Sequence, residues 1–133
     1  MYSKASKAAR GAIAGLAILV AAACSDSATG LEDVEVSNQT DTFQFQANAT
    51  DVTQNLSYNW SNTGTSANVN QSGTLTGGTA VLEIRDGAGA LVYQRSLAET
   101  GTFQTDTGVT GTWIIRVLLA DAGGALNFRV EKP

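Results

Sequence analysis

The 133-residue sequence contains no histidine, one cysteine and one proline, and its eight basic residues are outnumbered by 12 acidic ones. Without histidine, the commonest general base and a common metal ligand are both missing. A single cysteine excludes an internal disulfide and a cysteine-rich zinc site. The formal net charge of −4 argues against a nucleic-acid-binding protein, because such proteins present basic stripes. We therefore expect no nucleic-acid partner, no metal site and no cofactor.

The remaining composition is that of a folded protein. Apolar residues make up 43% of the chain and charged residues 15%. This is too apolar and too weakly charged for a disordered chain. The length corresponds to about one domain.

The first 23 residues have the organisation of a secretory signal peptide. Residues 1–10 carry three basic residues and no acidic one, and residues 11–23 are apolar without a charge. An apolar segment of that length spans roughly 20 Å as a helix, less than the ~30 Å hydrocarbon core of a bilayer. Residues 1–23 are therefore predicted to be a signal peptide that is cleaved.

Residues 20–24, Val-Ala-Ala-Ala-Cys, resemble the lipobox of bacterial lipoproteins. In that family the cysteine thiol takes a diacylglycerol before cleavage and then becomes the new N-terminus. The resemblance covers the first 24 residues and departs from the family at Ala21, where leucine is usual. It implies lipidation of Cys24 and anchoring in the bacterial cell envelope. The alternative is ordinary secretion after cleavage behind Ala23, which would leave Cys24 as an odd thiol.

Removal of the signal peptide leaves 110 residues with five basic and all 12 acidic ones, a formal charge of −7. Such a charge repels anionic headgroups. Membrane attachment is therefore expected to come from the acyl chains on Cys24, of which two or more hold stably. Ser25 is compatible with transport to the outer membrane, on its periplasmic or surface face, by resemblance to the sorting rule of enteric bacteria.

Residues 24–38 are predicted to form a flexible tether. The segment begins with small polar residues and continues with three acids within residues 32–35, so it has little apolar surface to bury. The alternative for this segment is a short first strand that contains Val34 and Val36. The folded domain is accordingly predicted to span residues 39–133.

From residue 40 onward, apolar and polar side chains alternate with a period of two. In residues 42–49, Phe43 and Phe45 share one face, and threonine, glutamine and asparagine share the other. Such alternation is typical of half-buried strands. Residues 112–120 are apolar on both parities, which predicts a strand near the middle of a sheet. The residues predicted to form strands are 42–49, 56–60, 67–75, 79–86, 90–97, 102–107, 112–120 and 125–131.

About eight short strands with turn signals every 8–12 residues predict an all-β fold, an antiparallel β-sandwich of the jelly-roll-like kind. Residues 79–130 also resemble the small bacterial β-sandwiches of the pre-peptidase C-terminal type. The matching residues are 86–89, Gly111, Trp113, Ile115, Val117 and 124–130. In that family such domains are accessory or binding modules, so the resemblance implies a sandwich fold and a binding role.

Trp60 and Trp113 have the chemistry to stack on sugar rings. Both share the parity of apolar neighbours, however, which favours packing in the core. Trp60 is kept as a candidate ligand contact.

Asp86, Asp106 and Asp121 lie in predicted turns and are the other candidate ligand contacts. With backbone carbonyls they could ligate calcium. No D-x-[DN]-x-[DN]-G run occurs in the sequence, and aspartate is favoured in turns for conformational reasons. The turn role is therefore the favoured interpretation.

The sequence shows no evident catalytic machinery. No histidine is present to activate a serine or threonine, and G-x-S-x-G does not occur. We expect a non-enzymatic, lipid-anchored binding or structural module that contacts an envelope protein or glycan. The alternative is a small carboxylate-dependent envelope glycoside hydrolase or lyase, which a close pair of acids in a concave pocket would favour.

Overall fold

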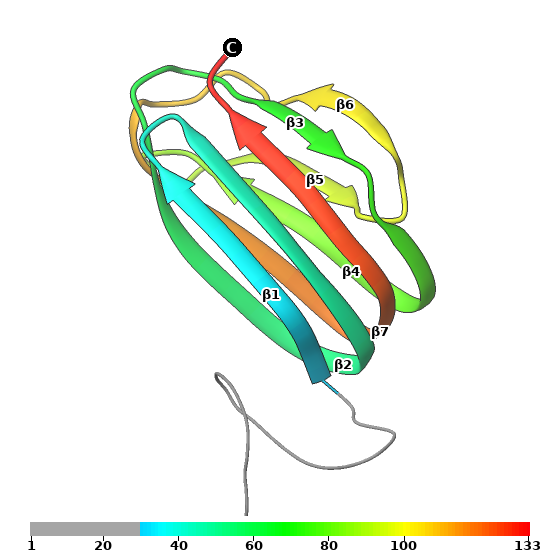
Figure 1. The fold of residues 1–133 in the computed structure, drawn as a ribbon. Coiled ribbons are helices and arrows are strands. Elements are labelled where there is room, and N and C mark those ends of the chain that lie inside the picture. The colour runs from blue at the N-terminus through cyan, green and yellow to red at the C-terminus, as the bar shows by residue number, and fades with distance from the viewer. Residues whose placement is uncertain (1–29) are drawn as a thin grey trace, which may run out of the picture.

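The computed structural model describes residues 30–133, so the predicted signal peptide, the lipobox and Cys24 lie outside the described residues. Within this range the chain forms seven antiparallel strands and no helix (Figure 1). The all-β, antiparallel sandwich predicted from the sequence is confirmed. The strands are β1 (Gly30–Gln39), β2 (Thr42–Asn62), β3 (Asn68–Gln71), β4 (Thr74–Arg85), β5 (Leu91–Ser96), β6 (Gly101–Gln104) and β7 (Gly111–Glu131).

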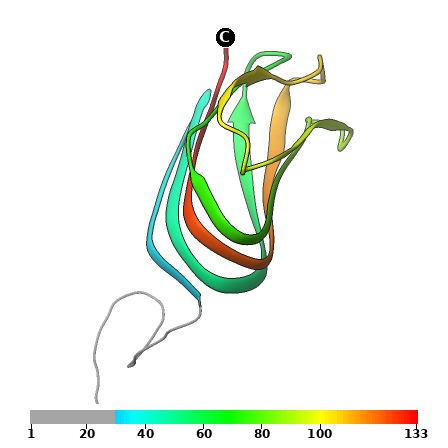
Figure 2. The same cartoon turned by 90° about the vertical axis from the view of Figure 1, so that its right-hand side faces the viewer.

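β2 and β7 are each 21 residues long and pair along their whole length, from Thr42 opposite Glu131 to Asn62 opposite Gly111. Each combines two segments that were predicted to be separate strands. The chain does fold back at residues 121–124, where the sequence predicts a turn, but β7 runs through this bend as one strand that stays paired with β2 and β4 (Figure 2). Joining these segments removes two of the eight predicted strands, and β1 adds one, so the described residues form seven.

The bend lies at the same level in three neighbouring strands. Asp51 in β2, Asp121 in β7 and Gly78 in β4 all have positive φ, at 52°, 51° and 64°. The register of β2–β7 shifts between Ala49 and Gln54, and the register of β4–β7 shifts beside Gly78. Such bulges bend strands sharply and let them pass from one layer of a sandwich to the other. Figure 2 shows the strands curving around this end of the molecule.

The bent strands create two layers from one continuous sheet. The first layer has the order β1-β2-β7-β3-β6 and uses residues 42–49 of β2 and 124–131 of β7. The second layer uses residues 54–62 of β2 and 111–119 of β7, followed by β4 and β5. The sheet does not close, so each layer ends in an edge strand on both sides.

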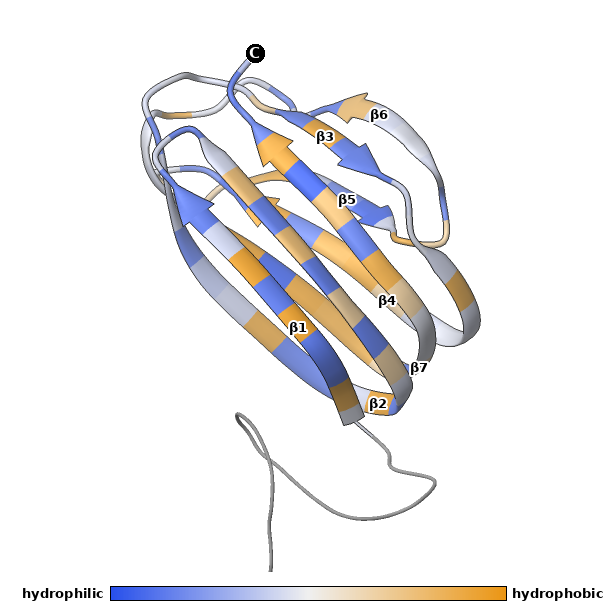
Figure 3. Cartoon of the chain, viewed as in Figure 1, coloured by the Kyte–Doolittle hydropathy of each residue, from blue (hydrophilic) through white to orange (hydrophobic). Residues whose placement is uncertain are grey.

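The core lies between the layers and follows the predicted alternation. Figure 3 shows apolar and polar residues alternating along β2 and β7. Phe45 and Phe128 stack with ring centroids 5.3 Å apart, and both are fully buried. In the second layer, β7 lies between β2 and β4, which confirms the central position predicted for residues 112–120.

The prediction of a flexible tether is wrong for residues 30–38. These residues belong to β1, which pairs with β2 from Gly30 opposite Thr50 to Gln39 opposite Thr42. Most β1 side chains are exposed, so the strand is held mainly by its backbone pairing with the first half of β2. A strand held by backbone pairing leaves almost no apolar pattern in its sequence. The described sheet therefore begins at residue 30, whereas the sequence predicts a domain that begins at residue 39.

Candidate functional site

Trp60 and Trp113 are core residues, as the parity argument predicted. Their exposed fractions are 1% and 0%, and their rings meet edge to face. The indole of Trp60 donates its N–H to the carbonyl of Gln39, and that of Trp113 donates to the carbonyl of Val109. The candidate role of Trp60 as a ligand contact is therefore wrong, because no ring face is available to a sugar.

Asp86 organises the loop between β4 and β5. Its carboxylate accepts hydrogen bonds from the backbone N–H groups of Ala88, Ala90 and Val109, at 2.8–2.9 Å. The bond from Val109, followed by the others, lowers the pKa of Asp86 below its usual value. The side chain is buried, and its acceptor capacity is used by the loops it joins. This is the turn role that the sequence favoured.

Asp106 and Asp121 lie in different parts of the molecule. Asp121 sits at the bend, where its carboxylate and backbone N–H both bond the hydroxyl of Thr53. Asp106 is exposed and borders a pocket beside β5. Within residues 30–133 no three histidine, cysteine or acidic residues come together in a way that could hold a metal ion.

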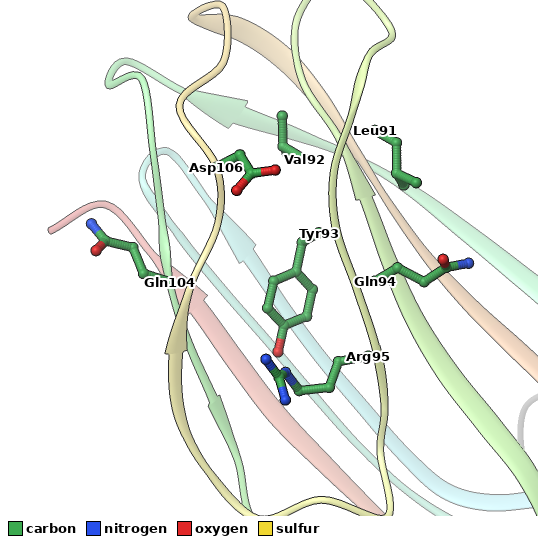
Figure 4. Close-up of a pocket in the computed structure, with 7 residues that line it drawn as sticks. All are labelled: Leu91, Val92, Tyr93, Gln94, Arg95, Gln104 and Asp106. Atoms are coloured by element: carbon green, nitrogen blue, oxygen red, sulfur yellow. The ribbon is translucent and has the colours of Figure 1, made fainter.

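The pocket beside Asp106 is a gap between two edge strands, β5 of the second layer and β6 of the first. Its volume is about 260 Å³. The Asp106 N–H donates to the Val92 carbonyl at 2.9 Å and closes one end, and the connection at residues 97–100 closes the other. In Figure 4 the side chains of Tyr93, Arg95 and Asp106 lie between the two chain segments, which form the walls.

The walls of this gap carry backbone groups that no strand pairs. β5 pairs only with β4, and β6 only with β3, among the described strands. Alternate residues of a strand direct their N–H and C=O groups to the same edge. Since Val92 and Asp106 bond each other across the gap, Gln94 and Gln104, two residues away on each side, also direct their backbone groups into it.

Arg95 forms one side of the gap. Its guanidinium lies 3.8 Å from the centroid of the Phe103 ring and bonds the Glu99 carboxylate at 2.7 Å. The hydrogen bond to Glu99 raises the pKa of Arg95. The Nε atom is buried and has no hydrogen-bond partner, alone among the buried side-chain nitrogens and oxygens of residues 30–133. Native proteins leave few such atoms unsatisfied.

Tyr93 forms the floor of the gap and joins it to the core. Its hydroxyl donates to Oε1 of Gln71 at 2.7 Å, and Nε2 of Gln71 donates to the carbonyls of Ser96 and Glu99. Gln71 is fully buried. Burial raises the pKa of Tyr93 to about 12, so the phenol stays protonated and keeps donating at neutral pH.

The residues that line this pocket do not include the close pair of acids that a two-carboxylate hydrolase would use. Asp106 is the one acidic residue among those lining it. Glu99 is held by Arg95, and Glu83, on the second layer, is held by Arg85 and Arg116.

A second feature is the solvent side of the first layer, which we call the outer polar face. Its side chains come from five strands and form cross-strand rows, one of which runs through Ser37, Gln44, Arg129, Asn70 and Thr102. Most members are uncharged donors and acceptors. The face consists of Glu32, Glu35, Ser37, Gln39, Thr42, Gln44, Gln46, Asn48, Asn68, Asn70, Thr102, Gln104, Asn127, Arg129 and Glu131.

Comparison with known proteins adds no relative: no family model, no curated protein and no solved structure matches the chain. The resemblances to bacterial lipoproteins and to pre-peptidase C-terminal-type domains therefore stay expectations. No helix in residues 30–133 has the length and hydropathy of a membrane span.

Proposed function

We propose that this protein is a lipid-anchored, non-catalytic binding or structural module of the bacterial cell envelope, which contacts a protein or glycan through the outer polar face. The observation that carries the proposal is the composition of that face. Five strands present amides and hydroxyls in aligned rows with few charges. Such groups both donate and accept hydrogen bonds, which suits a partner rich in hydroxyls or amides.

The position of the first strand supports presentation from a membrane. Gly30 lies six residues after Cys24, and six extended residues span at most about 20 Å. β1 begins at the bent end of the sandwich (Figure 1), so an anchor at Cys24 would hold that end near the bilayer. The outer polar face would then stand beside the anchor, accessible to other envelope components.

The anchor is tested by comparing the native protein with residues 25–133 placed behind a cleavable secretory signal. The native protein should partition into the detergent phase, and residues 25–133 should not, because without acyl chains the acidic chain has no basic patch to hold it on anionic lipid. Native protein that stays soluble without detergent would refute the anchor.

The face is tested by pull-down from detergent-solubilised envelope. The variant Gln46→Ala/Asn70→Ala removes two exposed amides from the outer polar face, and Gln54→Ala/Asn55→Ala removes a matched pair from β2 in the second layer. We expect the first variant to lose the retained partner and the second to keep it. Turnover of a glycan or ester that disappears when one pair of acids is mutated would replace the binding module with an enzyme.

A further inference from the structure

We propose that the gap between β5 and β6 is a binding site for one neutral sugar residue, held by the backbone edges of the two strands, Arg95 and Asp106. The site shares Gln104 with the outer polar face, which uses its side chain, whereas the site uses its backbone, and the proposal does not depend on the partner-binding role of that face. Figure 4 shows the side chains of Arg95 and Asp106 within the gap, one toward each end, with the ring of Tyr93 between them.

The gap offers donors and acceptors in comparable numbers. The N–H groups of Gln94 and Gln104 face the gap, and the Arg95 side chain, which is 36% exposed, adds its guanidinium, so donors come from both strands and one side chain. The carbonyls of the same two glutamines and the carboxylate of Asp106 are acceptors. A sugar hydroxyl donates one hydrogen bond and accepts others, so adjacent hydroxyls can satisfy both kinds of group at once.

The charges around the gap favour a neutral ligand. The guanidinium of Arg95 is already paired with Glu99 at 2.7 Å, and Asp106 adds a negative charge with no basic partner within the described chain. The three charged groups sum to −1, so an anion is repelled, and a cation cannot accept hydrogen bonds from the N–H groups that face the gap. A hydroxylated neutral molecule avoids both penalties.

The size of the gap limits the ligand to about one ring. Its volume of about 260 Å³ is below the usual lower limit of roughly 300 Å³ for sites of drug-sized ligands. The Asp106–Val92 hydrogen bond closes one end, and the connection at residues 97–100 closes the other. An extended peptide strand therefore cannot run through the gap, but the terminal residue of a glycan can enter from the solvent side.

The test uses the full-length protein in a detergent without a sugar headgroup, followed by two-dimensional ¹H–¹⁵N NMR. The probes are glucose, galactose, mannose and N-acetylglucosamine, with sodium acetate as the anion, ammonium chloride as the cation and alanine as the zwitterion. We expect at least one sugar to shift three signals together and saturably: the amides of Gln94 and Gln104 and the Nε–H of Arg95. The amide of Gln54, on β2, should not move. If the methyl glycoside of the same sugar binds equally well, the ligand is the end of a glycan. If the methyl glycoside does not bind, the ligand is a free sugar.

Two variants test whether the side chains of Arg95 and Asp106 contribute to sugar binding. Arg95→Lys keeps the charge but removes the planar guanidinium, and Asp106→Asn removes the charge but keeps one acceptor. Each should weaken sugar binding about tenfold, which corresponds to one hydrogen bond to a charged group. Asp51→Asn, at the exposed bend, is the matched control and should bind as the native protein does; asparagine tolerates the positive φ there.

Three results would overturn the proposal. The first is the absence of any saturable shift at Gln94, Gln104 and Arg95 with all four sugars, which would make the gap a solvated space between edges. The second is preferential binding of acetate, ammonium or alanine at these signals. The third is equal loss of sugar binding in Asp51→Asn, which would place the sugar elsewhere on the protein.

Discussion

The indole rings of Trp60 and Trp113 meet edge to face, with centroids 6.0 Å apart and planes at 89°. The two residues are direct cross-strand partners in β2 and β7. Aromatic pairs in this arrangement add about 0.5–1.5 kcal/mol beyond their burial. Because each N–H also bonds a backbone carbonyl at the end away from the bend, the pair joins the core of the second layer to the loops there.

We expect Trp113→Ala to lower the free energy of unfolding by about 3–5 kcal/mol, as loss of a fully buried large aromatic does. Urea unfolding followed by far-ultraviolet circular dichroism measures the change. Val109→Ala is the control, because its side chain is 52% exposed and should change stability little. A loss below about 1 kcal/mol for Trp113→Ala would contradict the core role.

Much of the fold could be predicted because alternation is a local signal. Phe43, Phe45 and Leu82 each lie inward on the parity that the sequence indicated. The segments pair in the antiparallel manner expected for short strands with turn signals between them. The continuity of the strand through the bend could not be predicted in the same way, since the sequence Asp-Ala-Gly-Gly at residues 121–124 is equally typical of a reverse turn and of a bulged strand. The pairing partners decide between these, and they lie about 70 residues away in the chain.

The candidate site was mostly hidden from the sequence. The sequence indicates Asp106 as a candidate contact, whereas the alternation in residues 90–97 predicts for Tyr93 and Arg95 only that they belong to a strand. The gap arises because β5 and β6 end different layers, which is a consequence of topology. Gln71, in the strand predicted over residues 67–75, is a polar residue that the structure buries completely and bonds to the Tyr93 hydroxyl, and its sequence position gives no sign of this.

Gly89 tests the backbone conformation of the β4–β5 loop. Its φ is +86°, and an added Cβ would meet no atom within 4 Å, so substitution is opposed by backbone strain and not by a clash. We expect Gly89→Val to destabilise the protein by roughly 1–2 kcal/mol in thermal or urea unfolding. Ala88→Val, in the same exposed loop, should have a smaller effect. Equal effects of the two substitutions would show that Gly89 is not required for its φ.

Asp86 should make the free energy of unfolding depend on pH in the acidic range. Its pKa is lowered in the folded protein, so it stabilises the fold above the ordinary carboxyl value of 3.8 and loses this contribution as pH falls through the lower folded value. We expect Asp86→Asn to be less stable at pH 7, because its amide cannot accept three N–H bonds. The difference from the native protein should shrink below about pH 4 in urea unfolding. A difference that stays constant down to pH 2 would contradict the role of the ionised carboxylate.

The Asp86 variant should not remove all acid sensitivity. The pKa of Asp41 is also lowered, chiefly by the backbone hydrogen bond from Thr63, so the same sign applies to it. Asp86→Asn should therefore still lose stability in acid, over a smaller range. Asp51→Asn, at the exposed bend, serves as the matched control and should follow the native curve.

Tyr93 provides the corresponding test in alkali. Burial raises its pKa to about 12, so its neutral form stabilises the fold fully below about pH 10 and loses this contribution as pH rises through about 12. Tyr93→Phe leaves Oε1 of the buried Gln71 without its donor, which should cost about 1–3 kcal/mol at pH 7. In urea unfolding, the difference between native protein and variant should shrink between pH 10 and pH 12. Tyr58→Phe is the control. Tyr58 is half-buried against Phe43, and burial raises its pKa as well. Its hydroxyl makes no hydrogen bond within residues 30–133, so loss of this hydroxyl should cost less stability at neutral pH. If Tyr93→Phe is as stable as the native protein at pH 7, the Tyr93–Gln71 bond does not support the floor of the gap.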